Sequence, residues 1–226
     1  MDVKLNFIEA GEGFPLVLLH GNGEDYTYFK HQLEPFSRHY RVIIVETRGH
    51  GQSPRGNAPF TLEQFAWDLK AFLDEKGIEK CHLLGFSDGG NIALEFVLRW
   101  PWYVDKLIVN GANLFPEGLV QWLQEENWQR LEQLSGRGLD DPDVRAEWEM
   151  VDLMASQPHI DPSALAGLTM PTLVVAGEDD VIQREHTQLI ADSIPGSRLE
   201  ILPTDHFVAK HCWQMFNPLI LNFLDC

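Results

Sequence analysis

Cysteines, basic residues and long apolar runs are all scarce in this sequence of 226 residues. The three cysteines, Cys81, Cys212 and Cys226, form no C-x-x-C pair, which disfavours both a disulfide framework and a cysteine-based zinc site. No stretch approaches the ~18 consecutive apolar residues of a membrane span, and the first residues lack the apolar core of a secretory signal. These absences predict a soluble cytoplasmic protein with reduced thiols and no membrane partner.

Acidic residues dominate the charge. Lys and Arg number 17 against 34 Asp and Glu, which gives a formal net charge of −17 and a pI near 4.8. A surface of this charge repels phosphate backbones and anionic lipid, so no nucleic acid partner is expected. The H-E-x-x-H, Walker A and dinucleotide-binding motifs are absent, so no cofactor is expected. A small-molecule substrate remains as the expected partner, and the oligomeric state stays open.

Strand and helix patterns alternate along most of the chain. Short apolar runs, typical of strands covered on both faces, are separated by stretches with helical spacing. Thr61 and Gln64 form a capping box at the start of the clearest helix. The predicted strands are 5–9, 16–19, 42–45, 81–84, 106–109, 172–176 and 199–202, and the predicted helices include 25–37, 61–77, 90–98 and 185–193. The pattern predicts an α/β protein with a mainly parallel, doubly wound sheet.

One segment, 113–167, interrupts this alternation. It contains no strand pattern and two helical stretches, 116–134 and 142–156, with Trp122, Trp128 and Trp148 among them. An insertion after the carboxyl end of a strand lies over the crevice where open α/β sheets bind ligands. The segment is therefore interpreted as a small helical lid inserted into a single domain, 1–226.

The run Gly85-Phe86-Ser87-Asp88-Gly89 lies between a predicted strand and a predicted helix. Strand, sharp turn and helix are the context that a G-x-S-x-G nucleophile elbow requires. The turn holds the serine in a strained conformation that exposes its hydroxyl, and its neighbours must be small because backbone approaches closely. Ser87 is therefore the candidate nucleophile.

A serine nucleophile needs a histidine base and a carboxylate that orients it. The strand 172–176 leads into the acidic run 178–180, and the strand 199–202 leads to His206. Both lie at the carboxyl ends of strands, where the crevice is expected. The residues themselves leave both Asp179 and Asp180 open as the acid. His211 is a second candidate base, although its place in a terminal helix favours packing or solvation.

Together these motifs resemble the α/β-hydrolase fold family, in its capped branch of esterases, carbon–carbon bond hydrolases, proline iminopeptidases and cofactor-free haloperoxidases. The resemblance covers essentially the whole chain and rests on Leu19-His20-Gly21, Arg48-Gly49-His50-Gly51-Gln52-Ser53, Gly85-Phe86-Ser87-Asp88-Gly89-Gly90, Gly177-Glu178-Asp179-Asp180 and Asp205-His206-Phe207. It implies the α/β-hydrolase fold without a cofactor. It also implies Asp180 as the acid, because Asp180 is the fourth residue of the G-x-x-D segment.

Acyl transfer also needs hydrogen-bond donors for a developing oxyanion. One expected donor is the backbone N–H of Asp88, which follows the nucleophile at a helix N-terminus. The resemblance implies the N–H of Asn22 as the second donor, with Gly23 as the alternative. The Asn22 side chain is interpreted either as reaching the site or as a turn residue. The Asp88 carboxylate is interpreted either as lining the pocket or as capping the helix.

An apolar lid predicts an apolar substrate pocket beneath it. The expected pocket residues are Leu114, Phe115, Trp122, Trp148 and Phe207. His20 and His50 are expected to brace the adjoining loops rather than to act in catalysis. The consecutive carboxylates 178–180 cannot all face one ion, so no metal site is expected.

The function predicted from these residues is that of a carboxylesterase-like serine hydrolase. Its substrate is predicted to be a small, fairly apolar ester or thioester, cleaved through a Ser-His-Asp triad and an acyl-enzyme. The same triad also supports cleavage of a carbon–carbon bond or an amide, because fold and triad do not determine the substrate. A third hypothesis is a ligand receptor that keeps only vestigial hydrolase activity.

Overall fold

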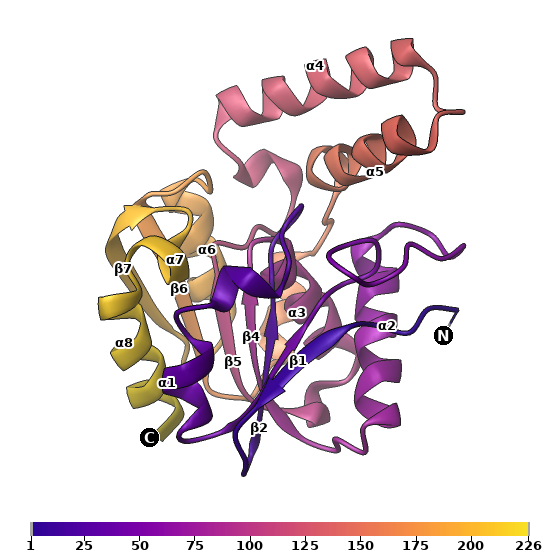
Figure 1. Cartoon of the computed structure of the whole chain (residues 1–226). Helices are drawn as coiled ribbons and strands as arrows, with labels where there is room; N and C mark the ends of the chain where they lie inside the picture. Colours follow the sequence, from indigo (N-terminus) through magenta and orange to yellow (C-terminus); the bar gives the residue numbers. More distant parts are fainter. Residues whose placement is uncertain (1, 226) are drawn as a thin grey trace.

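The computed structural model describes residues 2–225. Its centre is a seven-stranded sheet with the strand order β1-β3-β2-β4-β5-β6-β7 (Figure 1). The strands are β1 (Phe7–Ala10), β2 (Pro15–Leu19), β3 (Arg41–Val45), β4 (Cys81–Phe86), β5 (Val104–Asn110), β6 (Thr172–Asp179) and β7 (Arg198–Asp205). Only β1 pairs antiparallel within this sheet; every other pairing is parallel. The prediction of a mainly parallel α/β sheet is confirmed.

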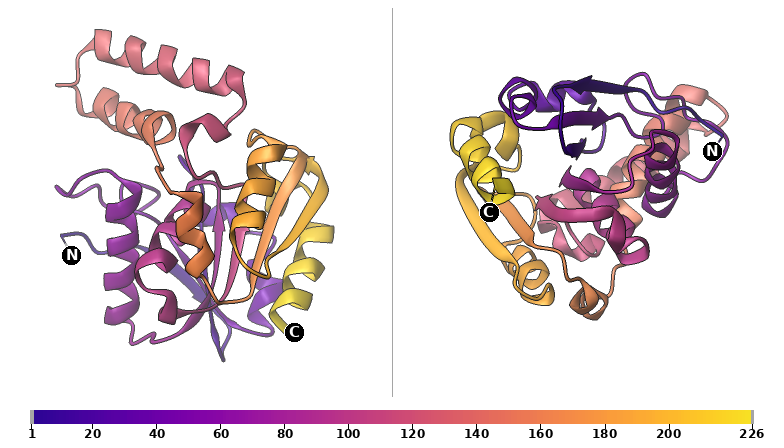
Figure 2. Two further views of the ribbon diagram at one scale, coloured as in Figure 1. Left: turned by 180° about the vertical axis from the view of Figure 1, so that it is seen from behind. Right: turned by 90° about the horizontal axis from the view of Figure 1, so that it is seen from below.

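Helices cover both faces of the sheet, as the views from behind and from below show (Figure 2). Alternate residues of β2 explain why: Val17 and Leu19 pack in one apolar cluster, and Leu16 and Leu18 pack in the other. Such a strand has no solvent face, which accounts for its unbroken apolar run. One cluster contains residues of α2 (Leu62–Glu75), α3 (Asp88–Arg99) and α6 (Arg184–Ser193), and the other contains residues of α1 (Leu33–Ser37), α7 (Val208–His211) and α8 (Trp213–Asp225).

The prediction of one continuous helix over 25–37 was wrong. The segment forms a 3₁₀ turn, η1 (Tyr26–Phe29), followed by the separate short helix α1. Pro35 gives a physical reason, because a proline has no N–H to donate and is tolerated only in the first turn of a helix. Gln32, which lies between the two segments, is completely buried. Its side-chain amide donates to the Ala209 carbonyl of α7 at 2.7 Å and so holds this part of the chain against α7.

Two long helices, α4 (Gln121–Arg137) and α5 (Pro142–Ser156), form a hairpin that projects beyond the carboxyl ends of the strands (Figure 1). The 3₁₀ turns η3 (Pro116–Gly118) and η4 (Pro162–Gly167) flank this α4–α5 hairpin, and another, η2 (Pro101–Tyr103), precedes β5. The hairpin has a small apolar cluster of its own, formed by Leu131, Leu134, Val144, Val151 and Ala155. Among residues 2–225, no helix is both long and apolar enough to cross a membrane.

Candidate active site

Ser87 lies on the turn between β4 and α3, in a backbone conformation that side chains rarely adopt. Its φ is 53° and its ψ is −122°, and no other non-glycine residue of the described chain has a positive φ. The neighbouring glycines make this turn possible. A Cβ on Gly85 would lie 2.2 Å from the Gly89 carbonyl oxygen, and one on Gly89 would lie 2.3 Å from that of Leu19. Strain of this kind costs about 1–3 kcal/mol and is typical of functional sites.

A continuous hydrogen-bonded chain joins Ser87 to His206 and Asp180. The Nε2 atom of His206 lies 3.0 Å from Ser87 Oγ, and its Nδ1 atom lies 2.6 Å from Asp180 Oδ1. His206 follows β7 and Asp180 follows β6, so neighbouring parallel strands deliver both side chains to the same edge of the sheet. When Nδ1 donates its proton to Asp180, the lone pair of Nε2 faces the serine hydroxyl.

The Asp180 carboxylate is held in its ionised form. Burial alone would raise its pKa, but the hydrogen bond from His206 and those from the backbone N–H groups of Ile182 and Gly177 outweigh burial and lower the pKa. The two backbone bonds measure 3.0 Å and 3.1 Å. A carboxylate with this many donors stays charged at neutral pH and orients the imidazole.

The alternative acid and base lie outside this chain of contacts. Asp179 is exposed, and His211 is an exposed residue paired with Asp205 at 2.9 Å. Within residues 2–225, no group of three His, Cys, Asp or Glu side chains is arranged to hold a metal ion.

The loop after β2 passes directly over the elbow. A Cβ on Gly21 would lie 2.9 Å from the Phe86 ring and 3.1 Å from Ser87 Cβ, so a larger residue here would force these side chains to shift. His20 braces the loop: its Nδ1 lies 2.8 Å from the Gly21 carbonyl, and its Nε2 accepts the Thr47 N–H at 3.1 Å. Burial lowers the pKa of His20 to about 4, so the ring stays neutral in this role. His50 likewise bonds to the Arg48 carbonyl at 3.0 Å.

The Asn22 side chain joins three parts of the molecule. Its Nδ2 donates to the Asp88 carboxylate at 2.8 Å and to the Met150 carbonyl of α5 at 2.9 Å. Both amide hydrogens are therefore used in contacts that link the loop, the nucleophile helix and the hairpin. This leaves the Asn22 backbone N–H, rather than its side chain, as the group of Asn22 available to an oxyanion.

The Asp88 carboxylate is buried and faces the site instead of capping α3. It accepts from the side-chain amides of Asn22 at 2.8 Å and Asn91 at 3.3 Å. Burial is the main influence on it and raises its pKa. A carboxylate in this position makes the site unfavourable for further negative charge.

A cavity of about 300 Å³ opens above Ser87. Its walls are mainly apolar, with a few polar groups. The lining residues are Asn22, Glu24, Phe86, Ser87, Asp88, Asn113, Leu119, Trp122, Leu123, Met154, Val181, Ile182, His206 and Phe207. Trp122 and Phe207 are thus where they were expected.

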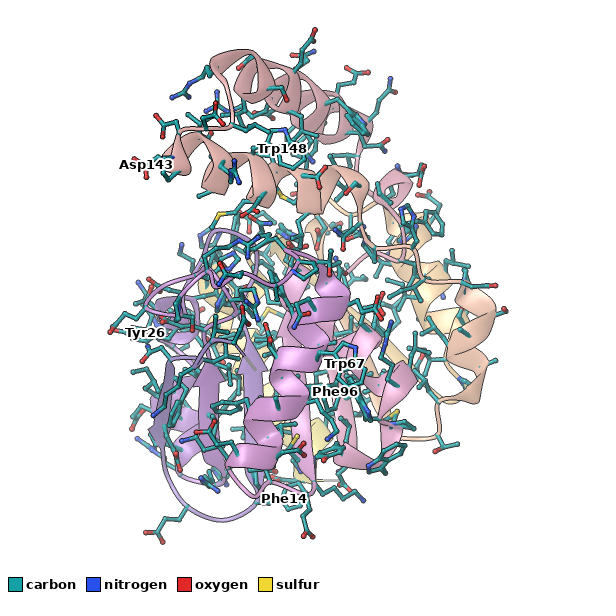
Figure 3. All side chains as sticks on the ribbon, turned by 90° about the vertical axis from the view of Figure 1, so that its right-hand side faces the viewer. Phe14, Tyr26, Trp67, Phe96, Asp143 and Trp148 are labelled. Atoms are coloured by element: carbon teal, nitrogen blue, oxygen red, sulfur yellow. The ribbon has the colours of Figure 1, made fainter. Side chains whose placement is uncertain are left out.

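The other three expected pocket residues lie elsewhere. Leu114 is completely buried in the main core, and Phe115 packs edge-on against the His186 ring at 4.5 Å. Trp148 lies in the α4–α5 hairpin (Figure 3), where its Nε1 donates to Ser135 Oγ at 3.1 Å. The structure does not place these three side chains at the cavity. For Trp148 the reason is that helical periodicity shows that a helix has an apolar face, but not which neighbour that face covers. Leu114 and Phe115 lie in the loop between β5 and η3, where no periodicity predicts which way a side chain faces.

Glu24 is a wall residue that the sequence did not indicate. Its Oε2 atom is buried and has no hydrogen-bond partner, and burial raises the pKa of the carboxyl to about 7. The residue directly follows the loop of Gly21, Asn22 and Gly23, but nothing in the sequence indicates that its side chain faces the cavity.

Replacing Glu24 with glutamine is expected to raise the Tm more at pH 8.5 than at pH 5.5. The folded-state pKa lies near 7 and the ordinary value is 4.5. Between these values the folded protein holds a proton that the unfolded chain has released, so stability falls as the pH rises through this window. Thermal unfolding at the two pH values measures the effect. The exposed Glu12→Gln serves as a control, and an equal Tm change for E24Q at both pH values would contradict the prediction.

Comparison with known proteins places this architecture in a family. The family model described as the alpha/beta hydrolase fold matches residues 15–136, more than half of the chain. The chain belongs to the alpha/beta hydrolase fold family. It is 30% identical to the human serine hydrolase BPHL, covering 99% of this chain and 84% of that one. It is 27% identical to an Escherichia coli 2-hydroxy-6-oxononadienedioate/2-hydroxy-6-oxononatrienedioate hydrolase, covering 98% and 91%.

A solved structure agrees with these sequence relatives. Est816, described as an N-acyl homoserine lactone degrading enzyme, is 26% identical, with a TM-score of 0.78 over 98% of this chain and 97% of the other. The family and these relatives identify the chain as a hydrolase.

Proposed function

We propose that this hydrolase cleaves a small, fairly apolar ester or thioester through an acyl-enzyme on Ser87. The observation that carries the proposal is the unbroken contact from Asp180 through His206 to Ser87, which opens onto a mainly apolar cavity. Nucleophile, base and orienting acid are the groups that acyl transfer by serine requires.

In the proposed reaction, the Ser87 hydroxyl attacks the substrate carbonyl while His206 Nε2 takes its proton. The backbone N–H groups of Asp88 and Asn22 donate to the oxyanion of the tetrahedral intermediate. His206 then returns the proton to the leaving oxygen or sulfur, which departs as the alcohol or thiol. A water molecule, deprotonated by the same nitrogen, attacks the acyl-enzyme and releases the acid. Asp180 stabilises the imidazolium in both steps.

The charge of the cavity bears on the choice of substrate. None of its lining residues in the described chain is Lys or Arg, and the acidic Glu24 and Asp88 both face it. The burial that raises the pKa of each carboxyl shows that negative charge is already disfavoured there. A neutral ester therefore fits better than a dicarboxylate such as the one in the name of the Escherichia coli relatives.

The second candidate is hydrolysis of a carbon–carbon bond by the same residues. Its support is the name of those relatives, which cover nearly all of this chain. A neutral vinylogous diketone would be the corresponding substrate here, because it avoids the charge conflict.

The decisive experiment compares four substrates at one pH: p-nitrophenyl butyrate, a butyryl thioester, a neutral vinylogous diketone and its dicarboxylate counterpart. We expect the ester or thioester to have the highest kcat/KM, and the dicarboxylate to lie at least tenfold below the neutral diketone. A diketone that exceeds both acyl substrates would replace the ester proposal with the carbon–carbon one.

We also propose that residues 1–226 act as one domain in which the α4–α5 hairpin serves as the lid. The bond from Asn22 to Met150 and the bidentate ion pair of Arg55 with Glu149, at 2.6 Å for each contact, attach the hairpin to the body. A cytoplasmic location is supported by Cys81 and Cys212, which are both free thiols. Cys226 lies outside the described residues.

A further inference from the structure

Asn127, on α4, is a buried amide with an unused donor. The residue is only 4% exposed, and its Nδ2 atom has no hydrogen-bond partner. Buried donors are nearly always paired, because leaving one unpaired costs free energy. The helix around it has ample exposed positions for a polar side chain, so an asparagine on the inner face calls for an acceptor that the chain itself does not supply.

Two further cavities border Asn127, and both adjoin the cavity above Ser87. One, of about 280 Å³, shares Leu119 and Met154 with the Ser87 cavity. The other, of about 700 Å³, shares Trp122, Leu123 and Met154 with it. Met154 therefore forms a wall common to all three. A methionine side chain is unbranched and readily changes rotamer, so this partition can move with little cost.

We propose that Asn127 marks a second subsite, between the two hairpin helices, that binds the distal end of the substrate and recognises a hydrogen-bond acceptor there. The inference rests on the proposed acyl transfer at Ser87. When the Met154 side chain turns aside, an arm of the substrate extends past it and presents an ether, keto or hydroxyl oxygen to the Asn127 amide. The substrate class is thus an ester with one oxygenated, otherwise apolar arm.

The acceptor is expected to be neutral. Glu117 lines the smaller of the two cavities and Glu126 lines the larger. Arg130, the one cation among their lining residues in the described chain, is already paired with Glu147. A carboxylate at the end of the arm would meet like charges without a free partner.

The test is a scan of oxygen position in two matched substrate series. The first series varies the acyl arm: p-nitrophenyl alkanoates of increasing length are compared with analogues in which one methylene is replaced by an ether oxygen. The second series varies the alcohol arm: butyrate esters of alkyl alcohols are compared with butyrate esters of alcohols that carry an oxygen at the same positions. At one position in one arm, we expect the oxygen to raise kcat/KM about tenfold, equivalent to about 1.4 kcal/mol. No preferred position in either series would overturn the subsite. If the unmodified protein did not hydrolyse p-nitrophenyl acetate, the proposed function itself would be overturned.

Two variants assign the preference to its residues. Asn127→Leu keeps the side-chain size and removes the donor, so it should abolish the positional preference without changing p-nitrophenyl acetate turnover. Gln121→Leu, which removes an exposed amide from the same helix, should leave the preference intact. Met154→Ala should raise the ratio of kcat/KM for long arms to kcat/KM for short arms. A preference that survives in N127L would show that Asn127 is not the donor.

Discussion

Replacing Ser87 with alanine is expected to lower kcat for p-nitrophenyl butyrate by roughly 10⁵- to 10⁶-fold. The variant lacks the hydroxyl that forms the acyl-enzyme, while His206, Asp180 and the backbone donors remain. A residual acceleration of roughly 10³-fold over water is expected to persist, because oxyanion stabilisation and binding do not depend on the nucleophile. Steady-state kinetics at high enzyme concentration can measure both the loss in kcat and the remaining acceleration over the uncatalysed reaction.

Ser163→Ala provides the matched control for this loss. Ser163 lies at an exposed position on η4, so its removal should leave the kinetics unchanged. Relief of the backbone strain at Ser87 is not expected, because alanine adopts a positive φ no more readily than serine does. Retention of more than a tenth of the activity in S87A would rule out Ser87 as the nucleophile.

Asp180→Asn is expected to lower kcat by about 10⁴-fold with little change in fold. The amide that replaces the carboxylate can donate to Nδ1, which favours the imidazole tautomer with its proton on Nε2. That nitrogen can then no longer accept the proton of Ser87. The carboxylate charge that stabilises the imidazolium is lost in the same substitution.

Asp179→Asn is the direct control, because it alters the neighbouring carboxylate, which is exposed, whereas the His206 Nδ1 hydrogen bond goes to Asp180. We expect it to retain nearly full activity. If D179N lost as much activity as D180N, or if D180N were nearly as active as the unmodified protein, the assignment of the acid would be wrong. Measuring kcat/KM of both variants over pH 5–9 separates the two possible causes of lost activity. A lost base changes the pH dependence, whereas a smaller fraction of folded protein lowers the activity by a similar factor at each pH.

The architecture was largely predictable because parallel strands carry an unambiguous signal. Strands buried on both faces are apolar over most of their length, and β2, β3 and β4 carry the apolar runs 16–19, 42–45 and 83–84. The acid and base segments were identifiable for a related reason. They lie where strands end, and the carboxyl ends of parallel strands meet at one edge of the sheet.

The choice between Asp179 and Asp180 shows the limit of the local signal. Both are acidic residues at the end of the same strand, and the last residues of β6 and β7 pair with a register irregularity between Gly177 and Asp179. That irregularity arises from the pairing with β7, so it cannot be predicted from the residues next to Asp179 and Asp180 in the sequence. Family resemblance, not periodicity, singled out Asp180.

Side chains on the hairpin were the least predictable part of the site. Trp122 and Trp148 are both large apolar residues on amphipathic helices, but only Trp122 faces the catalytic cavity. The difference depends on how the hairpin is attached to the body, through contacts such as Asn22 to Met150 across a long stretch of chain. Contacts of this range, and the unpaired amide of Asn127, become visible only in three dimensions.

Covalent labelling by a fluorophosphonate, followed by peptide mapping, tests the central claim most directly. The unmodified protein is expected to gain one phosphonyl group, mapped to Ser87, and to lose its esterase activity in proportion. H206A should label far more slowly, because the hydroxyl then lacks its base. Labelling on a different residue, or undiminished labelling of S87A, would contradict the account.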